Sequence, residues 1–236
     1  MNTRSQFTLG RVVSGSPDRV WTTAALSLIF ALTSVAQDFS AQNQLRMTRI
    51  VCRYSGPNIA PDSRQTQALT IYRSGNKYER VEHPPDATHK THRLEITSEP
   101  DAWYINLADQ TAVHVLDKGP DFSVRHHILS LPSGQTDPAF VDLEFGKEAI
   151  FARQAQAKEI GMRKIDNQEA RVFVAKGGDR EATLFFDSAT DKPLRIEVTK
   201  NGKADMTVDY MEYETGLAFD PTLFELPKGI KITEQK

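Results

Sequence analysis

Apolar and polar residues alternate along three segments near the C-terminal end of the sequence. About one residue in two is apolar over 181–187, 194–199 and 203–210, and turn residues separate these segments. A period of two with one apolar side is typical of strands in a sheet that exposes one face to water. The pattern therefore predicts three consecutive antiparallel strands.

Similar alternation runs through much of the preceding chain. We expect further strands over residues 47–54, 66–73, 77–82, 92–97, 102–107, 111–117, 122–131, 163–165 and 169–176. Turn residues such as Ser74-Gly75-Asn76 and Asp166-Asn167 separate neighbouring strands and predict hairpins. Short connections between sequence neighbours predict one long antiparallel meander.

Helix-forming sequence is scarce in this chain. Asp137 and Pro138 form a typical helix start, and residues 140–158 are rich in Leu, Glu, Lys, Ala, Gln and Arg. A second, shorter helix is predicted over 38–46. Gly146 is expected to divide the longer helix into two pieces.

About ten amphipathic strands present more apolar surface than these helices can cover. Such a sheet closes into a barrel, folds over itself as a sandwich, or curls into a half-barrel with helices in its mouth. In the half-barrel, part of the apolar face is left as a groove, which suits an apolar ligand. A fully packed barrel or sandwich without a cavity is the alternative.

The N-terminal segment has the pattern of a secretory signal. Trp21–Leu32 is an uncharged and mostly apolar run that follows three arginines, and small residues lead up to Ala36. Twelve residues are too few to span a bilayer core of about 30 Å. We expect a cleaved signal peptide over 1–36 and a single exported, periplasmic domain over 37–236, with no membrane-spanning segment after cleavage.

Composition narrows the classes of function further. The 236 residues carry a formal net charge of −2, which gives no electrostatic footprint for nucleic acid. Cys52 is the single cysteine, so no internal disulfide can form, and we expect it to be a buried strand thiol.

The C-terminal stretches resemble the LolA-like family of periplasmic outer-membrane lipoprotein carriers and their relatives. The resemblance lies in Leu184–Asp187, Lys192–Glu197 and Asp220–Pro227, the last reading D-P-T-L-F-E-L-P. It implies an α+β fold in which a curved antiparallel sheet, a half-barrel, carries a few short helices on its concave face. It also implies an apolar cavity for acyl chains and a role in outer membrane biogenesis. Residues 132–161 depart from the carriers, so the fold transfers more readily than the activity.

On this basis the protein is predicted to be a soluble exported protein that holds lipid or lipoprotein acyl chains. The apolar residues of the alternating strands are predicted to line the groove, and a filled core without a groove would contain the same residues. They are Leu69, Ile71, Leu184, Phe186, Leu194, Ile196, Met206 and Val208. An envelope-stress sensor or interaction domain of the same fold, acting on an envelope protein partner, is an alternative.

A metal-dependent enzyme is a third reading of the sequence. His83, His89 and His92 lie within ten residues of one another, and three ligands with a water can hold zinc. Their spacing matches no known zinc motif, and the chain contains neither G-x-S-x-G nor H-E-x-x-H. We therefore expect no catalytic activity, no cofactor and no metal site.

Overall fold

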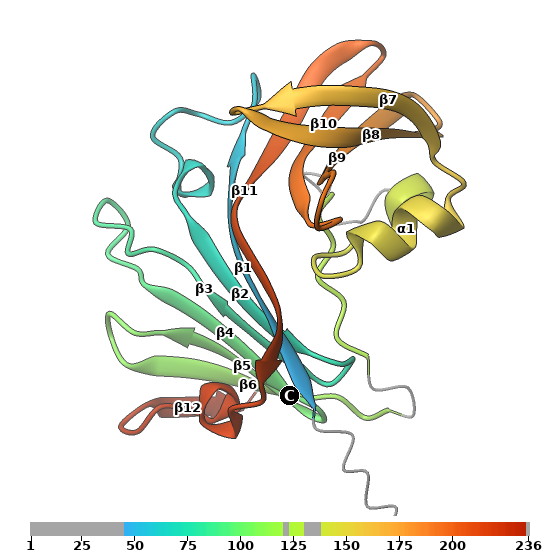
Figure 1. The fold of residues 1–236 in the computed structure, drawn as a ribbon. Coiled ribbons are helices and arrows are strands. Elements are labelled where there is room, and N and C mark those ends of the chain that lie inside the picture. Colours follow the sequence, from blue (N-terminus) through green and yellow to red (C-terminus); the bar gives the residue numbers. More distant parts are fainter. Residues whose placement is uncertain (1–44, 120–122, 130–137, 235–236) are drawn as a thin grey trace, which may run out of the picture. The chain divides into compact units, whose positions relative to one another are not determined.

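The computed structural model describes residues 45–119, 123–129 and 138–234. These residues form one open sheet of 12 strands in the order β12-β6-β5-β4-β3-β2-β1-β11-β10-β9-β8-β7. Figure 1 shows that the sheet twists and curves strongly, with β7 and β8 arching over α1. Open sheets of this size curl because strand twist accumulates across them.

Two meanders build the sheet and meet at its centre. The first comprises β1 (Arg46–Ser55), β2 (Leu69–Ser74), β3 (Tyr78–Glu82), β4 (Arg93–Ser98), β5 (Asp101–Asn106) and β6 (Thr111–Leu116). The second comprises β7 (Lys158–Ile165), β8 (Gln168–Gly177), β9 (Arg180–Asp187), β10 (Pro193–Lys200) and β11 (Lys203–Ala218). The pairing of β11 with β1 joins the two meanders into one sheet.

The remaining elements are short. The described residues contain one α-helix, α1 (Glu148–Gln154), and three 3₁₀ turns, η1 (Arg64–Thr66), η2 (Pro138–Phe140) and η3 (Pro221–Phe224). The last strand, β12 (Lys231–Glu234), pairs in parallel with the edge strand β6. Within the described part of the chain, no helix combines the length and apolar character needed to cross a membrane.

Buried side chains gather on both faces of the sheet. On one face, α1 and the segment 138–147 cover residues such as Ile50, Ile71 and Leu184. On the other face, Phe224 in the tail after β11 covers residues such as Leu94 and Ile105. Ile71 and its neighbour Tyr72 pack into different clusters because successive side chains of a strand point to opposite faces.

The predicted fold class is confirmed: a curved, mostly antiparallel sheet with little helix. The hairpin across Asp166-Asn167 is also confirmed, and both residues have positive φ (46° and 71°), as a tight two-residue turn requires. Cys52 is fully buried on β1, and burial raises the pKa of its thiol to about 12. The parallel strand β12 was not predicted.

The helix predicted over 140–158 is wrong in length. Gly146 has a φ of +81°, which ends any helical path before it, and α1 starts only at Glu148. Residues 158–165 form strand β7 instead of continuing the helix. The helix predicted over 38–46 falls mostly outside the described residues, and Arg46 already belongs to β1.

The strand predicted over 122–131 is also wrong. Among the described residues 123–129, the one ladder contact is an isolated bridge between His127 and Glu144. The backbone of this segment bonds to other loops, for example from Val124 N to Asn76 O (2.8 Å). The segment therefore covers the sheet instead of joining it.

Gly177 provides a test of how closely η2 packs on the sheet. A Cβ at Gly177, at the end of β8, would lie 2.1 Å from the Cβ of Ala139 in η2. We expect Gly177→Ala to lower the free energy of unfolding by about 1–3 kcal/mol through this overlap, measured by urea denaturation. The double variant Gly177→Ala with Ala139→Gly should recover most of the loss. Equal destabilisation in both variants would contradict the close packing of η2 on β8.

Candidate functional site

A buried polar cluster lies between the sheet and the segment that covers it. Arg73 and Glu79 are opposite one another on β2 and β3, with Arg73 Nε 3.2 Å from a carboxylate oxygen of Glu79. Arg73 also donates to the backbone carbonyls of Phe145 and of Val124 (2.9 Å for the latter), and it lies 3.6 Å from Glu144. The guanidinium thus links β2 to two segments that cover the sheet, residues 123–129 and residues 138–147.

Glu148 is the second part of this cluster. It is the first residue of α1 and is 1% exposed. Its carboxylate accepts hydrogen bonds from Tyr210 Oη (2.8 Å), Tyr213 Oη (3.1 Å) and the backbone N–H of Gly146 (2.9 Å). These bonds stabilise the charged form, but burial outweighs them and raises the pKa of Glu148.

A register shift on β11 makes this arrangement possible. Tyr210 and Tyr213 are three residues apart, so in a regular strand they would point to opposite faces. The ladder between β1 and β11 shifts between the pairs Val51–Glu212 and Cys52–Tyr210, which leaves Met211 as an extra residue. This β-bulge turns both tyrosines toward Glu148.

A cleft of about 350 Å³ opens beside α1, over β8 and β9. Phe173 and Phe186 pack edge to face in it (5.7 Å between ring centroids), and Ala149, Ala152 and Ala157 line its other side. Its charged lining includes Arg153, Arg171 and Asp191. The cleft therefore combines an apolar interior with a charged rim.

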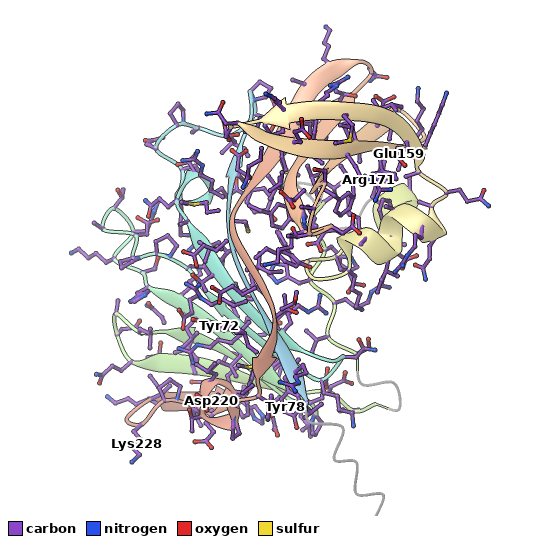
Figure 2. The ribbon with its side chains drawn as sticks, in the orientation of Figure 1. Tyr72, Tyr78, Glu159, Arg171, Asp220 and Lys228 are labelled. Atoms are coloured by element: carbon purple, nitrogen blue, oxygen red, sulfur yellow. The ribbon has the colours of Figure 1, made fainter. Side chains whose placement is uncertain are left out.

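The charges at the rim are largely paired. Arg171 contacts Glu159 (3.2 Å, Figure 2) and Asp191 (3.0 Å), and its guanidinium lies over the ring of Phe173 at 5.1 Å. Arg153, in the last turn of α1, makes no ion pair with another described residue. The guanidinium of Arg153 is therefore a cation of the rim without a described acidic partner, and it lines the same cleft as Phe173 and Phe186.

Most of the predicted groove residues lie together in one buried cluster. The predicted residues that belong to this cluster are Leu69, Ile71, Leu184, Phe186, Ile196 and Val208. Met206 packs against its margin. Phe140, Leu143, Phe145 and Phe151 cover them, so in this structure they pack as a core, and only Phe186 lines the cleft. That they bind a ligand stays a prediction.

Leu194 does not join this cluster. It is the extra residue of a β-bulge between Pro193 and Arg195 on β10, which moves it out of the alternation. It packs with Phe185 and Val172 on the opposite face. Sequence alternation alone cannot place a residue at a bulge.

The three candidate histidines make contacts with different residues. His83 contacts Glu95 (3.2 Å) and His89 contacts Asp86 (2.8 Å), whereas the backbone N–H of His92 donates to Asn106. No group of three His, Cys, Asp or Glu residues suited to a metal ion occurs in the described part of the chain.

Sequence reasoning missed the polar cluster, although a signal for part of it was present. Arg73 falls in the same alternation phase as Leu69 and Ile71, and Glu79 falls in phase with Val81. A charged residue in an apolar phase on each strand of a hairpin predicts a buried pair across it. Glu148 carries no such signal, because its tyrosine partners are more than 60 residues away.

The sequence matches no protein-family model, and it matches no curated protein. Among the solved structures that are similar in fold are the following three. An uncharacterised conserved protein from Thermus thermophilus has 14% identity and a TM-score of 0.48, with 82% of this chain and 93% of that chain covered. Lipoprotein LppX from Mycobacterium tuberculosis has 8% identity and a TM-score of 0.33, covering 74% of this chain and 90% of that one.

The third is a putative outer membrane lipoprotein-sorting protein domain from Vibrio parahaemolyticus, with 11% identity, a TM-score of 0.33 and coverage of 75% and 88%. All three TM-scores lie below 0.5. A lipoprotein-sorting domain is thus among the similar structures, while membership of the LolA-like family stays a prediction.

Arg73→Met tests the buried ion pairs. The substitution removes the arginine that pairs with the buried carboxylate of Glu79. It also removes one of the cations beside Glu144, which keeps Arg125 and Lys147. Because Glu79 then stays buried without its arginine, we expect the free energy of unfolding to fall by about 3–5 kcal/mol in urea denaturation. Arg53→Met is the control, because Arg53 is exposed and lies 3.8 Å from Asp209; it should change stability by less than about 1 kcal/mol. Similar effects of the two substitutions would refute the role of Arg73.

Glu148→Gln tests the raised pKa of that carboxyl. A group whose pKa is higher in the folded state stabilises the fold below its unfolded pKa, and this contribution is lost as pH rises through the folded pKa. The free energy of unfolding of the wild type should therefore fall relative to Glu148→Gln as pH rises from about 4. Denaturation curves across this range check the expectation, and parallel pH profiles for the two proteins would contradict it.

Proposed function

We propose that the protein binds the apolar chain of an amphiphile, a lipid or a lipoprotein acyl chain, in the cleft between α1 and β8–β9. The observation that carries the proposal is the aromatic and alanine lining formed by Phe173, Phe186 and the facing side of α1. Apolar side chains bury the chain, and the charged rim leaves the polar end of the ligand in water.

The size of the cleft limits what it can hold. A volume of about 350 Å³ lies at the lower end of the range for small-molecule sites, about 300–1,000 Å³. Each buried methylene contributes about 0.8 kcal/mol, so about ten methylenes contribute roughly 8 kcal/mol before the costs of ordering are subtracted. This favours one acyl chain bound with micromolar or weaker affinity.

The cellular role belongs to the same proposal. The signal-like segment 1–36 lies outside the described residues, and we propose that it directs the protein to the periplasm as a soluble carrier or holder of such chains. No specific contact in the described residues favours the envelope-sensor or metal-enzyme alternatives.

Ala149→Trp tests the cleft. Ala149 is exposed on α1 and lines the cleft, so an indole there fills the space with little cost to the core. We expect the affinity for a fluorescent fatty acid to fall about tenfold or more, which corresponds to about 1.4 kcal/mol. Displacement of the probe by unlabelled fatty acid measures the affinity.

Ile150→Trp is the matched control, since Ile150 is the next residue, is 43% exposed and does not line the cleft. It should leave fatty acid binding unchanged. Equal loss in both variants would indicate a general effect of tryptophan on α1, and no loss in Ala149→Trp would place the ligand elsewhere.

A further inference from the structure

A second hollow lies away from α1, beside η1 and the start of β4. Its volume is about 480 Å³, and polar or charged residues line it: Asp62, Ser63, Arg64, Asp86, Thr88, His89, Thr91 and Arg93. The loop before β2, which contains η1, and the loop before β4 supply all of these residues except Arg93, the first residue of β4. No apolar side chain lines it, so it is unsuited to an acyl chain.

Both loops are held by local hydrogen bonds. Ser63 Oγ caps η1 by accepting from Gln65 N (3.3 Å), and Thr66 Oγ1 donates to the carbonyl of Ser63 (2.7 Å). In the other loop, Asp86 and Thr91 exchange two backbone hydrogen bonds of 2.7 and 3.1 Å. Because these bonds fix the backbone, Arg64 and Arg93 start from defined positions.

The two arginines of the hollow have no acidic group in direct contact within the described part of the chain. Neither Arg64 nor Arg93 makes an ion pair or a side-chain hydrogen bond with another described residue. Burial, and then the positive charge of Arg93, lower the pKa of Arg64, while Asp86 and Glu95 act in the opposite direction. Two guanidinium groups that repel each other across one hollow form a site that an anion would stabilise.

Two of the nearby carboxylates have hydrogen-bond partners of their own. Asp86 accepts from the backbone N–H of His89 (3.0 Å) and contacts the His89 ring (2.8 Å) through its other oxygen. Glu95 contacts His83 at 3.2 Å. Asp62, which is exposed, lines the hollow and has no described cationic partner.

We propose that Arg64 and Arg93 bind the phosphate group of a ligand, either free inorganic phosphate or the headgroup of a phospholipid. The guanidinium groups supply charge-assisted donors, and the hydroxyl groups of Thr88 and Thr91 line the same hollow. This site shares no residue with the acyl-chain cleft, so it stands or falls independently of that proposal.

The test is a titration of the full chain with inorganic phosphate, followed by amide chemical shifts and by the unfolding temperature. We expect saturable binding that Arg64→Gln and Arg93→Gln each weaken about tenfold or more, the scale of losing a hydrogen bond to a charged group. Arg163→Gln is the matched control, since Arg163 is exposed on β7 and makes the same change of charge. Its phosphate affinity should equal that of the wild type.

Asp62→Asn provides a variant of opposite sign. It removes a negative charge from the lining, so it should tighten phosphate binding several-fold if an anion occupies the hollow. This gain cannot arise from impaired folding. An unchanged or weaker affinity in Asp62→Asn would count against an anion in this hollow.

Vesicles distinguish the two sources of phosphate. Flotation with phosphatidylglycerol mixed into phosphatidylcholine, compared with phosphatidylcholine alone, measures headgroup binding. Loss of flotation in Arg64→Gln and Arg93→Gln but not in Arg163→Gln supports a headgroup, whereas saturation by inorganic phosphate alone supports the free ion. If neither probe binds, or if all three arginine variants behave alike, the proposal is overturned.

Discussion

The pairing of β1 with β11 is the constraint on which the rest of the fold depends. Among the described strands, this ladder is the one that joins the first meander to the second, and it brings together residues more than 150 positions apart in the sequence. Closing so long a loop is entropically costly, so the contacts on either side of the pair must compensate for it. Ile50 and Val208, fully buried on the two strands, supply part of that compensation.

The irregularity in this pair is as important as the pair itself. The bulge at Met211 places Tyr210 and Tyr213 on one face, and these tyrosines hold Glu148 at the first turn of α1. Arg73 holds the chain before α1 in a similar way, because it donates hydrogen bonds to the carbonyls of Val124 and Phe145. A helix of seven residues is too short to be stable alone, so these polar contacts and the burial of Phe151 fix its position, and with it the cleft.

Sequence reasoning succeeded where structure is local and failed where it is not. Alternation and turn residues located most strands, because a hairpin such as that across Asp166-Asn167 is specified by its own residues. The segment 122–131 has a strand-like composition, but its backbone partners, such as Asn76, are distant. Leu194 was assigned to the wrong face because a bulge interrupts the alternation. The Glu148 site depends on the same kind of irregularity and was therefore beyond the reach of pattern alone.

The expectation of an apolar groove rested on the shortage of helix, but helix is not the sole kind of cover that a sheet can have. Irregular chain covers an apolar sheet as well as helix does, provided that its backbone groups find partners. Residues 138–147 cover one face with Phe140 and Phe145, and the tail that carries Phe224 covers part of the other. Open apolar surface is therefore expected where the cover ends. For the first face this is the flank of α1, where the helix and the two residues 156 and 157 face Phe173 and Phe186 across the cleft.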